Sequence, residues 1–190
     1  MASGMRSEAI DHDDHFAWKV VICRPAMLPH TAATSAFRDR PMSFTVRQAT
    51  IHDIDLVASL FDAYRQFYGR PADLALAKHF LLERFRHHES VILLAVDKEG
   101  RGVGFTQLYP LFSSVRAART YLLNDLFVAA DARRSGVAAA LIHEAMDFSR
   151  AAGAVGMSLT TAHTNEAAQR LYESLGWKRD LEFREYSIAL

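Results

Sequence analysis

The stretch of residues 121–145 constrains the fold more than any other part of the chain, because it joins an apolar run to a helical pattern through a basic turn. The turn carries Arg133, Arg134 and Gly136. A helix start has unpaired N–H groups and about half a positive charge, so it can receive a phosphate. Glycine lets a ligand approach closely, and the arginines add charge. We therefore expect a phosphate-bearing cofactor here, although such a turn also occurs where it serves only capping and solvation.

Composition excludes several classes of protein. The chain has 190 residues, of which 50% are hydrophobic, which is typical of one domain with a real core. Its 22 basic and 22 acidic residues balance, which argues against a broad nucleic-acid surface. No apolar run reaches the roughly 18–20 residues of a membrane span. A single cysteine, Cys23, excludes an internal disulfide and fits a cytoplasmic location.

Residues 1–42 differ from the rest of the chain. They contain Pro25, Pro29 and Pro41 and show no sustained period. We expect a weakly ordered N-terminal extension here, followed by one domain over residues 43–190. The acidic and histidine-containing run at residues 11–15 could suggest a metal site, but nothing there fixes a coordination geometry, and no metal is expected.

From residue 43 onward the hydrophobic period alternates between strand and helix. A capping box at Thr50 and Asp53 predicts the first helix start. The glycines at 100, 102 and 104 do not precede a helix, so they do not indicate a dinucleotide site. The pattern predicts strands over residues 44–48, 91–96, 103–111, 121–128, 155–160 and 186–190, one short strand near Trp177, and helices over residues 54–68, 74–85, 137–152 and 165–175.

Two segments resemble the signatures of one known family. Residues 133–138, Arg-Arg-Ser-Gly-Val-Ala, resemble the Arg/Gln-x-x-Gly-x-Gly/Ala motif of the GNAT N-acetyltransferase superfamily. Residues 165–177 resemble its second motif, which ends in Leu-Tyr-x-x-x-Gly-Phe/Trp. Ala138 replaces a common glycine, which the family tolerates. Over residues 44–190 the resemblance implies the α/β GNAT acyl-CoA N-acyltransferase fold: a mixed, mostly antiparallel sheet of six to seven strands, helices on both faces, and a splay between the two central strands.

The resemblance also implies acetyl-CoA as co-substrate. Its pantetheine arm would pair with the strand that precedes the basic turn, where one N–H could hold the developing oxyanion. Its pyrophosphate would meet the turn itself. Asn165 would lie near the pantetheine, or serve as a helix N-cap, or both. The residues expected to hold the cofactor are Leu126, Phe127, Val128, Arg133, Arg134, Ser135, Gly136, Val137, Ala138 and Asn165.

The implied reaction is acetyl transfer to a primary amine by direct attack in a ternary complex. The attacking amine must be neutral, which costs about 4–5 kcal/mol at neutral pH for a lysine-like group. Asp125 could accept the proton through water or hold the positive charge, or it could instead cap a bulge. Tyr172 resembles the family's tyrosine that donates to the leaving sulfur; without the motif, a packed tyrosine would be the simpler interpretation.

The acceptor is expected to contact the first two helices. Tyr64, Phe67 and Tyr68 could surround an ammonium group by cation–π attraction, although Tyr64 also fits a buried stripe. Gln107 and Tyr109 alternate on one strand face and could line the acceptor groove. The segment resembles the GNAT branch named for a yeast acetyltransferase of histones and polyamines. That resemblance suggests a polyamine, a small amine or amino acid, or a protein lysine.

Two classes of function remain open from the sequence. The first is the N-acetyltransferase, and the second is a non-catalytic acyl-CoA-binding sensor or interaction module. The family resemblance also suggests a homodimer, whereas neither a nucleic acid nor a membrane is expected as a partner.

Overall fold

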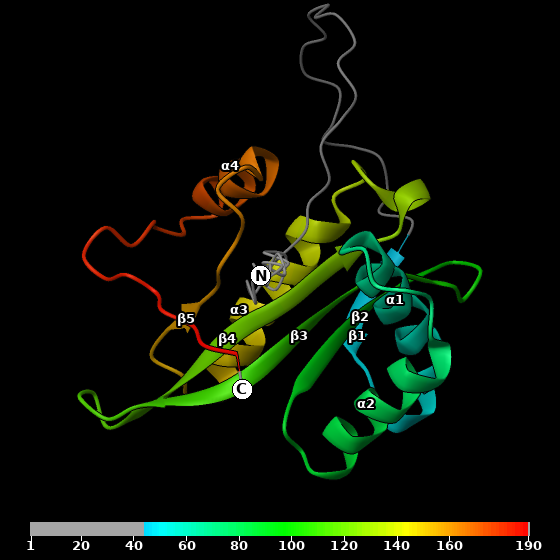
Figure 1. Ribbon diagram of the computed structural model, residues 1–190, viewed down its shortest axis with the longest axis horizontal. Coiled ribbons are helices and arrows are strands. Elements are labelled where there is room, and N and C mark those ends of the chain that lie inside the picture. The colour runs from blue at the N-terminus through cyan, green and yellow to red at the C-terminus, as the bar shows by residue number, and fades with distance from the viewer. Residues whose placement is uncertain (1–43, 190) are drawn as a thin grey trace, which may run out of the picture.

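A five-stranded sheet in the order β1-β2-β3-β4-β5 forms the middle layer of the computed structural model, which describes residues 44–189 (Figure 1). The first four strands are antiparallel to their neighbours, and β5 runs parallel to β4. The expected extension and the acidic run within it lie outside the described residues. The strands are β1 (Phe44–Gln48), β2 (Val91–Asp97), β3 (Gly102–Ser113), β4 (Ala118–Val128) and β5 (Met157–Ser158).

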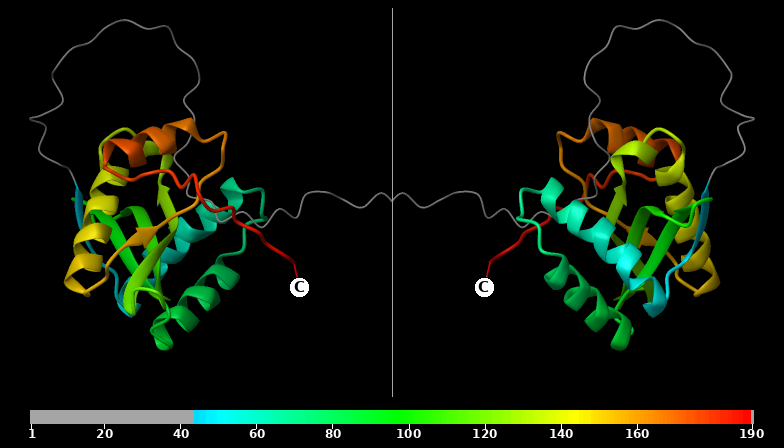
Figure 2. Two further views of the ribbon diagram at one scale, coloured as in Figure 1. Left: turned by 90° about the vertical axis from the view of Figure 1, so that its left-hand side faces the viewer. Right: turned by 90° about the vertical axis from the view of Figure 1, so that its right-hand side faces the viewer.

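Helices cover both faces of the sheet, as expected from the sequence (Figure 2). One face carries α1 and α2, and the other carries α3 and α4. Two short 3-10 turns, η1 and η2, precede α1 and α3. The bounds are η1 (Ile51–Asp53), α1 (Ile54–Phe67), α2 (Leu74–Arg86), η2 (Ala130–Ala132), α3 (Val137–Ala151) and α4 (Glu166–Ser174).

The continuous apolar run of β2 divides the core into two clusters. Leu93 and Ala95 pack in the cluster under α3 and α4, whereas Ile92 and Leu94 pack in the cluster under α1 and α2. Side chains of a strand alternate between faces, so a strand covered on both faces must be apolar throughout. The prediction of a fully buried strand here is confirmed.

The capping box predicted at Thr50 and Asp53 is confirmed and joins β1 to α1. The backbone N–H of Thr50 donates to the Asp53 carboxylate at 2.8 Å, and Arg47 donates to the same carboxylate at 2.6 and 2.8 Å. The hydrogen bonds from Arg47 hold the pKa of Asp53 well below its usual range, against the opposing effect of burial. The entry to the first helix is therefore fixed by a charge-assisted contact.

The prediction of a strand at the end of the sequence is wrong for the residues that the structure describes. Residues 177–189 contain no strand, and Tyr186 and Ile188 are 86% and 84% exposed. The short strand expected near Trp177 is absent for the same residues, so the described sheet has five strands instead of six or seven. Alternation makes a segment suitable for a sheet, but a strand forms only where an edge pairs with it. The strand expected over 155–160 is also reduced to β5, because the chain leaves β4 after Ser158.

The backbone at Gly104 on β3 lies close to β4 and to α3. A Cβ atom there would lie 2.9 Å from the carbonyl oxygen of Phe127 and 2.9 Å from Cγ1 of Val137. We predict that Gly104→Ala lowers the free energy of unfolding by about 1–3 kcal/mol, because the backbone cannot give way without strain. Urea denaturation measures the change. Gly156→Ala is the matched control, since its Cβ would meet only a flexible guanidinium at 3.4 Å. Equal urea midpoints for the two variants would contradict this packing.

Candidate active site

The strands β4 and β5 separate soon after they pair. β4 pairs with β3 as far as Val128, but it pairs with β5 only at Tyr121 and Leu122. After β5 the chain leaves the sheet and rises towards α4 (Figure 1). The outer edge of β4 beyond Leu122 therefore has no strand beside it within residues 44–189. This is the splay expected from the sequence, but it lies beside an edge strand instead of between two central strands.

The backbone groups of the last residues of β4 point alternately towards β3 and towards this opening. The N–H of Ala129 donates to the carbonyl of Val103 on β3 at 2.9 Å. Because backbone groups of an antiparallel strand alternate between its two neighbours, Phe127 faces β3, and Leu126 and Val128 face the opening. A hydrogen-bonding ligand laid along β4 would therefore meet Leu126 and Val128 first.

No side chain of the described residues caps the start of α3. Its N-cap is Gly136 at φ 89°, no side chain bonds to the first turn, and that turn contains no acidic residue. In contrast, Asp73 caps α2 and Asn165 caps α4. Nothing within 4 Å would meet a Cβ at Gly136, so the space before the helix is open. Unpaired N–H groups with open space before them form a ready anion site.

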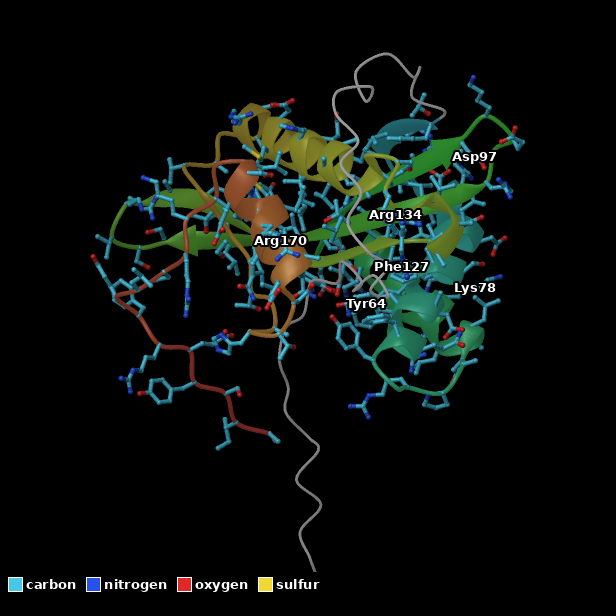
Figure 3. The ribbon with its side chains drawn as sticks, turned by 90° about the horizontal axis from the view of Figure 1, so that it is seen from above. Tyr64, Lys78, Asp97, Phe127, Arg134 and Arg170 are labelled. Carbon is cyan, nitrogen blue, oxygen red and sulfur yellow. The ribbon has the colours of Figure 1, made fainter. Side chains whose placement is uncertain are left out.

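The basic turn before α3 is held to the end of β4. Nε of Arg133 donates to the carbonyl of Val128 at 3.2 Å, and the hydroxyl of Ser135 donates to the carbonyl of Ala132 at 2.6 Å. Arg134 is exposed and has a left-handed φ of 62°. In the view of Figure 3, Phe127 of β4 lies between Arg134 and Tyr64 of α1. The structure thus brings the opening and the basic turn together on one side of the sheet.

A β-bulge shapes β4 at its centre. Gln107 lies opposite Asp125, but Leu108 lies opposite Leu123, so Asn124 is an additional residue in β4. The Asn124 amide donates to the Asp125 carboxylate at 3.0 Å. Sequence reasoning missed Asn124, although two adjacent polar residues inside an apolar strand are a sign of a bulge.

Asp125 lies at the centre of a buried polar cluster with three tyrosines. Its side chain is hydrogen-bonded to Tyr64, and Tyr64 is hydrogen-bonded to Tyr68. Burial raises the pKa of Asp125 above its usual range. Burial and then the Asp125 charge raise the pKa values of Tyr64 and Tyr109. A carboxylate in such surroundings binds a proton or a cation more readily than one in water.

Tyr172 places one hydroxyl in this region without a partner. The residue is 4% exposed, and its hydroxyl oxygen has no hydrogen-bond partner among the described residues. Burial, and to a smaller extent the nearby Tyr68, raise the pKa of Tyr172. The phenol therefore stays protonated at neutral pH and can donate.

The residues expected to bind the acceptor amine differ in how much of each side chain is exposed. Tyr64 is 8% exposed and belongs to the core under α1 and α2, which is the buried-stripe interpretation. Phe67 is 44% exposed, and its ring centroid lies 5.6 Å from that of Tyr68. Gln107 is fully buried, and its amide nitrogen donates to the Ser90 hydroxyl at 2.7 Å. Only Phe67, Tyr68 and the half-buried Tyr109 retain accessible surface.

Residues 44–189 contain neither a candidate membrane span nor a candidate metal centre. No helix in this range is long and apolar enough to cross a bilayer. In the same range, His, Cys, Asp and Glu side chains form no group of three or more that could hold a metal ion.

Comparison with known proteins finds similarity to acetyltransferases. The model of the acetyltransferase (GNAT) family matches residues 55–177. The chain is 45% identical over 143 residues to YhfO of Bacillus subtilis (strain 168), an uncharacterized N-acetyltransferase, which covers 75% of this chain and 95% of that protein. It is 34% identical over 141 residues to a probable acetyltransferase of Haemophilus influenzae, with 73% and 92% covered. A crystal structure of a probable acetyltransferase is 44% identical, with a TM-score of 0.73 over 77% of this chain and 97% of that one.

The raised pKa of Asp125 leads to a prediction on stability. The folded state binds the Asp125 proton more tightly than the unfolded state, whose aspartate pKa is about 3.9. The parent protein therefore loses stability as pH rises above that value towards the folded-state pKa. Because Asp125→Asn cannot ionise, its urea midpoint relative to the parent should rise between about pH 4 and pH 7.

The control is Asp53→Asn. Because the pKa of Asp53 is lowered, that carboxylate contributes stability that is present above about pH 4 and lost in acid. The midpoint of Asp53→Asn relative to the parent should therefore fall as pH rises in the acid range and stay level above about pH 5, where that of Asp125→Asn still rises. A pH-independent difference between Asp125→Asn and the parent would contradict the assignment of a strained, buried carboxylate.

Proposed function

Because the chain belongs to the GNAT family of N-acetyltransferases, we propose that it transfers the acetyl group of acetyl-CoA to a primary amine by direct attack in a ternary complex. One observation carries the proposal: the unpaired edge of β4 leads directly into the uncapped start of α3. The edge offers alternating donors and acceptors to an amide-containing chain. The helix start offers N–H groups to a diphosphate.

The described residues fit acetyl-CoA along this path. Leu126 and Val128 would bond the pantetheine amides, and the turn from Arg133 to Ala138 would bind the pyrophosphate. Asn165 accepts a hydrogen bond from the N–H of Ala168 at 3.4 Å, so its capping role is present, and its position at the start of α4 also fits a role beside the pantetheine. When bound, acetyl-CoA supplies an acetyl group activated as a thioester.

Asp125 and its neighbours would prepare the amine. An amine arrives largely as an ammonium ion, and a buried carboxylate attracts it and then takes its proton, directly or through water. The raised pKa of Asp125 makes that carboxylate a stronger base than an exposed one. Phe67 and Tyr68, at the rim, would contact the alkyl part or the charge of the incoming group.

The acetyl transfer itself needs stabilisation at two atoms. The neutral amine nitrogen forms a bond to the thioester carbon, and an outward N–H of Leu126 or Val128 would stabilise the carbonyl oxygen as it gains charge. The carbon–sulfur bond then breaks. Tyr172 would donate a hydrogen bond or its proton to the departing sulfur, and its hydroxyl has no other partner among the described residues to compete for that donation.

The acceptor class is a primary amine on a polyamine, a small amine or amino acid, or a protein lysine. The aromatic and acidic character of the cluster supports an amine of positive charge. The resemblance to the yeast-named branch, the cytoplasmic location and the homodimer stay predictions. The balanced charge of the whole chain provides no strong field that would select among the acceptors.

Tyr172→Phe tests the catalytic part of the proposal. We predict that kcat falls by about tenfold or more, since the variant loses a proton donor that acts only as the sulfur leaves. The affinity for acetyl-CoA and the thermal midpoint should change little, because the hydroxyl bonds to no described residue. Thiol release from acetyl-CoA, measured across polyamines, amino acids and basic peptides, reports the rate.

Tyr121→Phe is the matched control. Tyr121 is also buried, but it lies where β4 and β5 are still paired. Loss of its hydroxyl should therefore leave kcat unchanged. An unchanged kcat in Tyr172→Phe would exclude the proton-donor role. Binding of acetyl-CoA without thiol release to any amine would favour the non-catalytic acyl-CoA-binding module.

A further inference from the structure

The carboxylate of Asp62 is buried in the second half of α1 and binds three donors. One of its oxygens accepts the backbone N–H of Asp73 at 2.9 Å and a guanidinium N–H of Arg65 at 3.3 Å. The other oxygen accepts the side-chain amide of Gln66 at 2.9 Å. We name this group of contacts the Asp62 clamp. A buried charge is costly unless hydrogen bonds satisfy it, and here the donors come from α1 and from the residue that caps α2.

The clamp closes the loop between the two helices, which we name the α1–α2 loop and define as residues 68–73. α1 ends in a Schellman motif, in which the N–H groups of Gly69 and Arg70 donate to carbonyls of the preceding turn at 2.9 and 3.1 Å. At the other end, the Asp73 carboxylate accepts the N–H group three residues later at 2.9 Å and caps α2. The hydrogen bond between Asp62 and the Asp73 N–H joins these two capped ends to each other.

Three aromatic rings at the end of α1 lead from the buried acid to the surface. Tyr64 is hydrogen-bonded to Asp125, and its ring lies 6.2 Å from that of Phe127 on β4 (Figure 3). The Tyr64 ring meets the Tyr68 ring edge to face at 5.1 Å, and the Tyr68 ring meets the exposed Phe67 ring in the same way at 5.6 Å. We name these three rings the aromatic series, which is continuous from Asp125 to the solvent.

The outer two rings of the series lie where a helix end would otherwise fray. Phe67 is the last residue of α1, and Tyr68 is its C-cap and the first residue of the α1–α2 loop. Helix ends lose their order readily where nothing holds them. Because Asp62 ties the far end of the loop back to the interior of α1, it keeps the Phe67 and Tyr68 rings in place beside Tyr64.

We propose that Asp62 is a positioning residue for the acceptor amine. It holds the Phe67 and Tyr68 rings where the chain of the amine lies while the amino group reaches Asp125. Aromatic rings attract both alkyl groups and cations, so the acceptor class that this arrangement favours is a primary amine on an extended alkyl or cationic chain. A short amine gains little from the outer rings. This inference rests on the proposed acetyltransferase function, which it makes more specific.

Amide hydrogen exchange on the full chain tests the clamp without any substrate. Asp62→Ala removes the acceptor for all three donors, so exchange at Gly69, Arg70 and Asp73 should become about tenfold faster or more. Asp62→Asn keeps an oxygen that can accept the Asp73 N–H, so its exchange rates should stay within about threefold of the parent. Equal exchange rates in the parent and in Asp62→Ala would overturn the proposal.

Steady-state kinetics test the role in acceptor binding, with thiol release from acetyl-CoA measured for spermidine and for ethylamine. We expect Asp62→Ala to raise the KM for spermidine about tenfold or more and the KM for ethylamine less than about threefold, because only the longer amine reaches the outer rings. The KM for acetyl-CoA should stay at the parent value. Asp62→Asn should restore the KM for spermidine.

Asp73→Ala is the matched control, since it removes the side chain that caps α2 but keeps the N–H that binds Asp62. It should lower the thermal midpoint and leave the KM for spermidine unchanged. An equal rise in KM for both amines in Asp62→Ala, or the same rise in Asp73→Ala, would show general destabilisation and overturn the proposal.

The two measurements separate failure of this inference from failure of the proposed function. Thiol release by the parent, with an unchanged KM for spermidine in Asp62→Ala, would contradict the role of Asp62 alone. If the parent releases no thiol with any primary amine, the acetyltransferase function fails, and the acceptor role of Asp62 fails with it. Hydrogen exchange still decides in that case whether Asp62 holds the α1–α2 loop.

Discussion

Within residues 44–189, β4 pairs with β3 along one edge, whereas along the other edge it pairs with β5 only at Tyr121 and Leu122. Unpaired backbone groups need a partner, which is water, a side chain or a ligand. The strand continues along the chain into the turn held by Arg133 and the uncapped helix start at Gly136, which is the part proposed to bind the pyrophosphate. The proposed binding of acetyl-CoA depends on that continuity, since neither half alone would select a molecule that carries both amides and a diphosphate.

The bulge in β4 gives the same strand a second role. It places Asn124 and Asp125 side by side, and the burial of Asp125 raises its pKa. Stability at neutral pH is lowered by such a group, so its position fits the view that strained ionisable groups gather at functional sites. Tyr172, the candidate acid, lies on α4, and its buried hydroxyl has no partner among the described residues. The candidates for base and acid thus come from two different elements, β4 and α4.

Features fixed by local chemistry could be predicted from the sequence. The capping box at Thr50 and Asp53, the buried strand β2 and the glycine turn before α3 each follow from a few neighbouring residues. Features that depend on pairing with distant strands could not. The additional residue Asn124 arises from the register of β3 against β4. The expected final strand does not form because no edge pairs with it within residues 44–189.

Amide hydrogen exchange with and without acetyl-CoA tests the central claim most directly. We predict that acetyl-CoA slows exchange at Leu126 and Val128 on β4 and at the first N–H groups of α3, while Phe127, already bonded to β3, changes little. Both sets should become protected at the same ligand concentration, because one molecule spans them. Unchanged exchange at both sets with millimolar acetyl-CoA, or protection confined to other parts of the sheet, would contradict the account.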